Sequence, residues 1–194
     1  MWEKIFTIFI ASALINNFVF ARYLGLCIFF GVTKRMETAV GMSVTFTMVM
    51  VISAVLSWFI YMYVMVPYSL GFLKIVIFIG VVAAFVQAAD TMMKKIAPAL
   101  YYKLGIYLAL IVTNCIIIAV PLINADEHYG LFESIALALG SGAGFSLALI
   151  IMASIRERLE LADVPKSFQG LPIAFVLTGL IALAFLGFSG MITL

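Results

Sequence analysis

The chain carries very little charge. Only 10% of its 194 residues are Asp, Glu, Lys or Arg, whereas 66% are hydrophobic. A soluble domain has roughly 45–50% apolar and about 25% charged residues, so this composition excludes a soluble protein and indicates an integral membrane protein. A crossing needs about 20 apolar residues, and the length therefore fits about six crossings with no soluble domain. The net charge of +2 gives no sign of a nucleic-acid partner, and membrane lipid is the expected surrounding.

Residues suited to catalysis are also scarce. The sequence has one histidine and two cysteines. Two cysteines are too few for a disulfide scaffold. It contains no Ser-His-Asp set, paired-carboxylate cleft or nucleotide-binding fingerprint. The single histidine, His128, falls in a polar loop and is expected to be solvated. The chain is therefore not expected to be an enzyme by itself.

Long apolar segments make up most of the chain. They cover about residues 5–30, 38–66, 71–92, 104–123, 131–155 and 171–193. Only helices or closed barrels satisfy the backbone in lipid, and these runs are too long for barrel strands. The sequence therefore predicts an all-α integral membrane protein with six transmembrane helices.

The basic residues predict the orientation. Eight of the eleven fall in the odd-numbered loops: Lys34, Arg35, Lys94, Lys95, Lys103, Arg156, Arg158 and Lys166. Basic loops stay in the cytoplasm, so both termini and the even-numbered loops are expected on the outer side.

The single membrane domain, residues 1–194, divides near Pro98 into two three-helix halves, about 1–98 and 99–194. Three is odd, so the halves enter the membrane from opposite sides as inverted repeats, which place functional sites near the midplane. Each half carries one cysteine in its first apolar segment, Cys27 in one and Cys115 in the other. The related placement suggests a shared ligand, a metal or an iron–sulfur centre.

Depth constrains that idea. Cys27 lies seven residues from Lys34, roughly 10 Å at helical rise, and Cys115 lies twelve residues from Lys103, roughly 18 Å. A common ligand therefore requires the first helix of each half to be broken or tilted. The expected places are Asn16-Asn17 and Gly25 in one half and Thr113-Asn114 in the other.

The number of cysteines is enough for only half of an iron–sulfur site. A [2Fe–2S] cluster takes four cysteine thiolates, and this chain offers two, so a second subunit would have to supply another pair. The alternative is that each cysteine packs as a small apolar residue.

Other polar residues have two interpretations each. Arg22, inside an apolar segment, either lies beside the cluster or extends its long stem to an interface. Asp90 either pairs with Lys94 one helical turn away or carries an ion or proton. The small residues 140–144 favour close helix packing over phosphate binding, because the Lys-Ser/Thr ending of a phosphate loop is missing. The polar stretch 156–170 is an interfacial loop or a docking site for a cytoplasmic partner.

Several motifs in order resemble a known family. They are Asn16-Asn17-Phe18-Val19, Leu24-Gly25-Leu26-Cys27, Thr113-Asn114-Cys115, Ile155-Arg156-Glu157-Arg158 with Asp163-Val164-Pro165, and Gly187-Phe188-Ser189-Gly190. Over essentially the whole chain the sequence resembles the A subunits of Rnf complexes and is similar to the E subunits of the related Nqr complexes. One departure is Ile28, where the family pattern has proline after the first cysteine.

The resemblance implies a multisubunit translocase in the bacterial cytoplasmic (inner) membrane. Rnf complexes move electrons between ferredoxin and NAD, coupled to Na⁺ or H⁺ translocation. The A subunit pairs with a homologous subunit of opposite topology (Rnf E type), while flavins and other clusters belong to further subunits. The resemblance makes Cys27 and Cys115 two ligands of one shared [2Fe–2S] cluster, with Arg22, Gly25, Thr113 and Asn114 as surroundings. The alternative function is a small secondary transporter or ion-channel subunit with no redox centre.

Overall fold

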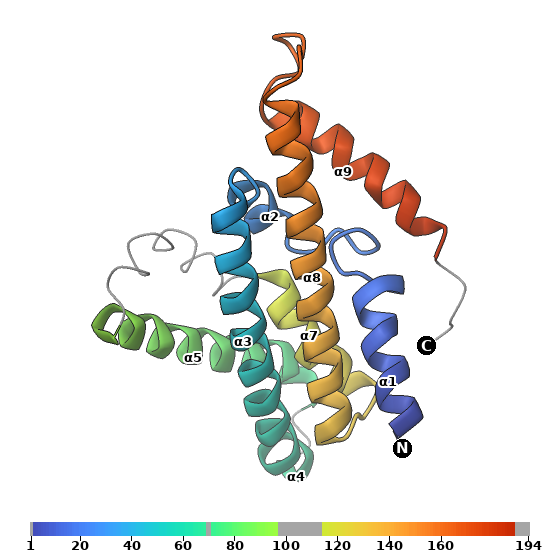
Figure 1. The fold of residues 1–194 in the computed structure, drawn as a ribbon. Helices are drawn as coiled ribbons and strands as arrows, with labels where there is room; N and C mark the ends of the chain where they lie inside the picture. The colour runs from blue at the N-terminus through green and yellow to red at the C-terminus, as the bar shows by residue number, and fades with distance from the viewer. Residues whose placement is uncertain (1, 69–70, 97–113, 189–194) are drawn as a thin grey trace.

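The computed structural model describes residues 2–68, 71–96 and 114–188, and within those ranges the regular structure is entirely helical (Figure 1). In chain order the elements are α1 (Trp2–Ile10), the π-helical turn η1 (Ala11–Ile15), α2 (Leu26–Val32), α3 (Met36–Ile60), the π-helical turn η2 (Tyr61–Met65), α4 (Val66–Tyr68), the 3₁₀ turn η3 (Gly71–Leu73), α5 (Lys74–Ile96), α7 (Cys115–Asp126), α8 (Leu131–Leu159) and α9 (Leu171–Leu186).

Three stretches of the described chain are long and apolar enough to cross a membrane: Met36–Tyr68, Gly71–Ala88 and Leu131–Leu159. Two shorter apolar helices, α7 and α9, accompany them. The all-helical class predicted from composition is confirmed. The six crossings and the inverted repeat stay predictions, in part because the first half of the fourth apolar segment lies outside the described residues.

The first apolar segment is not one helix. It runs through α1 and η1, leaves helical geometry between Asn16 and Gly25, and resumes as α2. The π-helical turn ends at Asn16, whose backbone N–H donates to Ala11 O at 2.7 Å. The break predicted at Asn16-Asn17 and Gly25 is therefore found, and it spans the whole interval between them.

The buried side chain of Asn17 holds this break against α8. Its Nδ2 donates to Gly144 O at 2.8 Å and to Ala13 O at 3.3 Å, and its Oδ1 accepts from Val19 N at 3.0 Å. A buried amide left unpaired would cost about 1–3 kcal/mol. Asn17 avoids that cost because each of its polar atoms has a partner.

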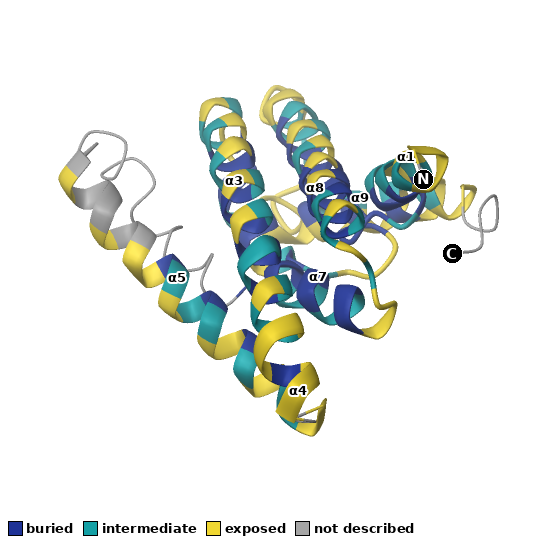
Figure 2. Ribbon diagram, turned by 90° about the horizontal axis from the view of Figure 1, so that it is seen from below, coloured by how far each residue is buried: buried dark blue, intermediate teal, exposed yellow. Residues whose placement is uncertain are grey.

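Helix α8 is the centre of the bundle, with α3, α7, α1 and η1 packed around it (Figures 1 and 2). Its glycines permit this. A Cβ at Gly140 would lie 2.0 Å from Ser12 Oγ, one at Gly142 would lie 2.7 Å from Thr47 Cγ2, and one at Gly144 would lie 2.7 Å from Ala13 O. The packing interpretation of residues 140–144 is thereby confirmed. The backbone of α1 and η1 leaves no room for a Cβ at Gly140 and Gly144, and at Gly142 the Thr47 side chain of α3 would have to move.

We expect Gly144→Ala to destabilise the protein, because overpacking costs about 1–3 kcal/mol and the atom it meets is backbone. Gly41→Ala on α3 is the matched control. Its Cβ has no neighbouring atom within 4 Å, and alanine is favoured over glycine in a helix by up to about 1 kcal/mol. Thermal unfolding of the two variants in detergent measures the difference. Equal midpoints would contradict the close-packing account.

The two ends of the bundle carry different connections. At one end the α2–α3 turn meets the end of α8, where Met36 N donates to Glu157 Oε1 at 3.0 Å (Figure 1). At the other end Lys4 pairs with Glu133 at 2.8 Å, and Trp58 Nε1 donates to Tyr129 O at 3.0 Å. Loops one and five therefore share one end, while the start of the chain and loops two and four share the other, as the basic residues predicted. Loop three lies outside the described residues, and which end faces the cytoplasm stays a prediction.

Candidate metal centre

Cys27 lies in the first turn of α2, immediately after the break. Two residues with positive φ, Tyr23 (55°) and Gly25 (76°), redirect the chain there, and Leu24 N donates to Phe18 O at 2.8 Å. Residues other than glycine rarely adopt such angles. The sharp change of direction presents Cys27 as an exposed free thiol at the start of a new helix.

Cys115 is the first residue of α7. Asn114 caps this helix, since its side-chain oxygen accepts from Ile116 N at 2.8 Å, and asparagine is among the preferred N-cap residues. The amide nitrogen of Asn114 is buried and has no hydrogen-bond partner in the described part of the chain. Cys115 is a free, partly buried thiol at the N-terminus of α7.

The two helix starts meet. The backbone N–H of Gly25 donates to Cys115 Sγ at 3.3 Å across 90 positions of sequence. Cys27 follows Gly25 by two residues, so their Cα atoms are at most about 7.6 Å apart, given the spacing of consecutive Cα atoms. Gly25 also packs against the residue after Cys115, because a Cβ on it would lie 2.6 Å from Ile116 Cδ1. The structure thus brings both cysteine-bearing turns to one place.

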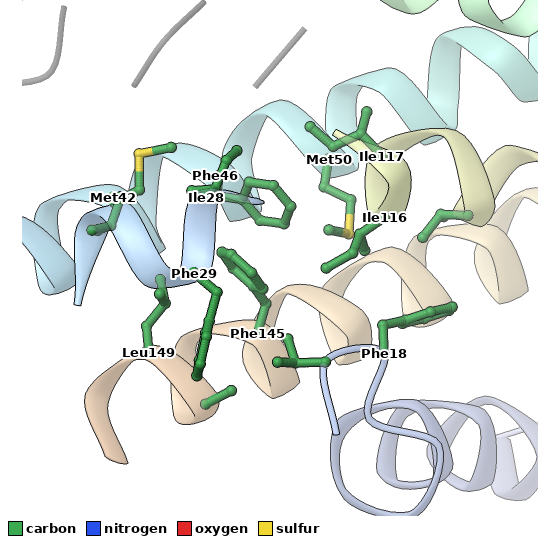
Figure 3. Close-up of a cluster of buried hydrophobic side chains, with 14 of the residues drawn as sticks. Phe18, Ile28, Phe29, Met42, Phe46, Met50, Ile116, Ile117, Phe145 and Leu149 are labelled. Atoms are coloured by element: carbon green, nitrogen blue, oxygen red, sulfur yellow. The ribbon is translucent and has the colours of Figure 1, made fainter. Parts of the chain in front are cut away.

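A buried apolar cluster anchors both turns (Figure 3). Ile28 and Phe29 follow Cys27, Ile116 and Ile117 follow Cys115, and all four side chains are fully buried. Figure 3 shows these side chains among those of α3 and α8, where the rings of Phe46 and Phe145 lie 4.2 Å apart. The cluster fixes the two helix starts while Cys27 stays outside it, so Cys27 does not pack as a small core residue of this chain.

The donor set suits part of a thiolate-ligated centre. Within the described ranges no group of three His, Cys, Asp or Glu residues is close enough to hold a metal ion. The whole sequence has only these two cysteines. Two free thiols on adjacent helix starts, one of them exposed, match two of the four ligands that a [2Fe–2S] cluster takes. The residues present therefore fit half of such a site.

Comparison with known proteins decides the family. The family model described as "Rnf-Nqr subunit, membrane protein" matches residues 5–192. The chain belongs to the Rnf-Nqr family. Among the relatives of this Rnf-Nqr protein is the A subunit of the proton-translocating ferredoxin:NAD(+) oxidoreductase complex of Clostridium ljungdahlii, which is 53% identical with 97% of each chain covered.

Two further relatives carry related names. The A subunit of the Na(+)-translocating ferredoxin:NAD(+) oxidoreductase complex of Acetobacterium woodii is 47% identical, with 95% of this chain and 96% of the relative covered. The A subunit of the ion-translocating oxidoreductase complex of Aromatoleum aromaticum is 46% identical, with 94% and 95% covered. The resemblance recognised in the sequence motifs is thereby confirmed.

The structure places Arg22 on the surface of the break. Its guanidinium carbon lies 5.6 Å from the centre of the Phe18 ring, a cation–π distance. Arg22 also borders a small cavity of about 110 Å³ together with Ser12, Glu127 and Tyr129. These neighbours belong to η1 and to the α7–α8 connection, which favours the interface interpretation, and a role beside a cluster stays a prediction.

The remaining predicted residues divide by where they fall. Thr113 and the side chain of Asp90 lie outside the described residues. Ile28 is the third residue of α2, fully buried, and the helix continues through it. The sharp turn in this Rnf-Nqr protein therefore lies before Cys27, at Gly25, and not after it. His128 is exposed as expected, and its Nδ1 lies 3.3 Å from the Tyr61 hydroxyl.

Two interactions close to the site were not predicted. One is the Gly25 N–H to Cys115 Sγ hydrogen bond. The other joins the Arg156 side chain to the end of α2, through Phe30 O at 2.9 Å and Thr33 Oγ1 at 3.0 Å. Arg156 falls within a recognised motif, but neither its spacing nor its flanking residues point to a partner 126 positions earlier.

Proposed function

We propose that this Rnf-Nqr protein is the A-type membrane subunit of an ion-translocating ferredoxin:NAD⁺ oxidoreductase, and that Cys27 and Cys115 supply two ligands of a shared [2Fe–2S] cluster. The first part is supported by the names of three relatives that match nearly the full chain at 46–53% identity. The second part rests on one observation, the hydrogen bond from Gly25 N to Cys115 Sγ that joins the two cysteine-bearing turns.

The chain's own groups suit that role. Both sulfurs are free, and the N–H of Gly25 would stabilise negative charge on Cys115 Sγ, which is how hydrogen bonds to sulfur tune such centres. The exposed Cys27 remains accessible to a second subunit. When bound, a [2Fe–2S] cluster accepts and releases one electron, which suits a relay between carriers on the two sides of the membrane.

The missing ligands imply a partner. Irregular backbone at membrane depth is tolerated only where it faces protein or a water-filled cavity, yet Arg22 and Tyr23 of the break are exposed in this chain, as is Cys27 directly after it. A homologous subunit of opposite topology, of the Rnf E type, would cover this surface and supply two further cysteines. The complex would lie in the bacterial inner membrane with both termini of this chain on the outer side.

The transported ion is not fixed by the relatives. One carries a proton-translocating name at 53% identity and another a Na⁺-translocating name at 47% identity, so either ion fits. The runner-up function is a small secondary transporter or ion-channel subunit without a redox centre, since broken helices also serve ion paths in transporters.

Iron and acid-labile sulfide analysis separates the two functions. Because other subunits of the complex would carry clusters of their own, the measurement compares the purified wild-type complex with a Cys27→Ala/Cys115→Ala double variant. We expect the double variant to lose one [2Fe–2S] equivalent of iron and sulfide while keeping its subunits. Equal iron and sulfide in both preparations would favour the transporter.

A further inference from the structure

The helix that carries Cys27 is held at its far end by α8. Arg156 Nη1 donates to Phe30 O at 2.9 Å and to Thr33 Oγ1 at 3.0 Å. Phe30 lies only three residues after Cys27, a rise of roughly 4.5 Å along the helix. The arginine therefore contacts the turn of α2 that directly follows the cysteine.

These bonds satisfy a helix end. The last carbonyls of a helix have no partner within it, and Phe30 O is one of the last in α2. Thr33 adds a second layer, since its hydroxyl donates to Phe29 O at 2.8 Å while accepting from Arg156. A cation at a helix C-terminus is also electrostatically favourable. Arg156 thus caps α2 from another element.

The neighbouring residue does the same for the next helix. Glu157 Oε1 accepts from Met36 N, the first residue of α3, at 3.0 Å. Arg35, the N-cap residue of α3, makes no capping side-chain bond of its own. The consecutive pair Arg156–Glu157 therefore places a cation on the end of α2 and an anion on the start of α3, and so fixes the turn between them.

Directional contacts are needed at this place because the rest of α2 is held by apolar packing. Ile28, Phe29, Phe30 and Val32 are buried, and such burial is non-directional. Hydrogen bonds at the two ends set the position along the axis: Gly25 N to Cys115 Sγ before the helix, and Arg156 to Phe30 O and Thr33 Oγ1 at its close.

We propose that Arg156 is a positioning residue for Cys27: by capping the C-terminal end of α2 it fixes where the thiol lies relative to Cys115. The inference rests on the proposed function, in which the two thiols share one centre. Arg156 touches neither thiol and acts through the seven-residue helix α2.

The test uses the assembled complex. We expect Arg156→Ala to shift the reduction potential and the electron paramagnetic resonance line shape of the cluster assigned to Cys27 and Cys115. We expect it to lower electron transfer about 10-fold, the lower end of what losing a group bonded directly to a ligand costs. Arg156→Lys retains a cationic donor and should restore most of both. Arg158→Ala, a change to an exposed arginine on the same helix, is the matched control and should match the wild type. If Arg156→Ala gave less assembled complex but an unchanged reduction potential, Arg156 would have only a structural role and the proposal would be overturned.

Two further measurements keep the inference testable. If Arg156→Ala does not assemble, Thr33→Val removes one acceptor at similar volume and should shift the potential in the same direction by less; an unchanged potential would overturn the proposal. Amide hydrogen exchange of the α2 peptide is independent of any cluster and should be faster in Arg156→Ala than in Arg158→Ala. Faster exchange together with full iron content in Cys27→Ala would support the Arg156 cap on α2 while sinking the cluster assignment.

Discussion

Replacing Cys27 or Cys115 with alanine in the assembled complex is expected to lower electron transfer between ferredoxin and NAD⁺ by more than about 100-fold, because even changes outside the ligand shell cost about 10–100-fold. Each substitution removes one thiolate of a four-thiolate site. The two thiols lie on adjacent helix starts joined by the Gly25 N–H, so neither is expected to replace the other. The two single variants should therefore show the same loss.

The change in volume is small, and assembly is expected to survive. Cys27 is exposed and Cys115 is only partly buried, so alanine leaves little or no cavity. Ser154→Ala is the matched control, since the Ser154 hydroxyl donates only to Ile150 O within its own helix. Co-purification of the other subunits checks assembly, and ferredoxin-dependent NAD⁺ reduction by membranes measures activity. Wild-type activity in either cysteine variant would end the relay interpretation.

Replacing Gly25 with alanine is expected to produce the second large effect, by moving the two cysteine-bearing turns apart. The φ of 76° at Gly25 costs other residues about 1–2 kcal/mol. The new Cβ would also lie 2.6 Å from Ile116 Cδ1 and 3.2 Å from Ile116 Cγ1, and overpacking of this kind costs about 1–3 kcal/mol. Both costs oppose the close approach of α2 to α7 that the hydrogen bond from Gly25 N to Cys115 Sγ requires.

A second substitution can identify the cause. Ile116→Val removes Cδ1, the atom nearest to the new Cβ, and by itself costs about 0.5–1.5 kcal/mol. We expect Gly25→Ala to lower cluster content and thermal stability, and the Gly25→Ala/Ile116→Val pair to regain part of both, with the φ strain remaining. Cluster content by optical and magnetic spectroscopy, with the unfolding midpoint, gives the measurement. A double variant no better than the sum of its parts would show that contact with Ile116 is not what excludes a side chain at Gly25.

The break in the first apolar segment shows what can and cannot be predicted from local sequence. Asn16-Asn17 and Gly25 are polar or conformationally free residues inside an apolar run, and a ligand shared by cysteines at different depths would require a break or tilt. The break was therefore predictable. That the Asn17 amide would donate to Gly144 O was not, because a hydrogen bond across 127 positions depends on which helices pack together.

The same division holds at the far end of α2. The motif containing Arg156 and Glu157 was recognisable, but charge and hydropathy alone describe it as part of an interfacial loop. In the structure Arg156 and Glu157 lie in the last turns of α8 and cap α2 and α3. The contact exists because α8 packs along α3 and its last turns reach the α2–α3 turn.

The sequence by itself determined that this is a membrane protein, that it is helical and that it has two thiols. It also determined which loops share an end and where the first apolar segment breaks. Each follows from properties that can be read locally along the chain: hydropathy, the charge of each loop and the positions of particular residues. Only the tertiary structure decided that Gly25 meets Cys115, that the turn lies before Cys27, and that Arg156 closes α2. The contacts of Gly25 and Arg156 join residues 90 and 126 positions apart, where local periodicity carries no information and the fit of side chains between helices selects the partner.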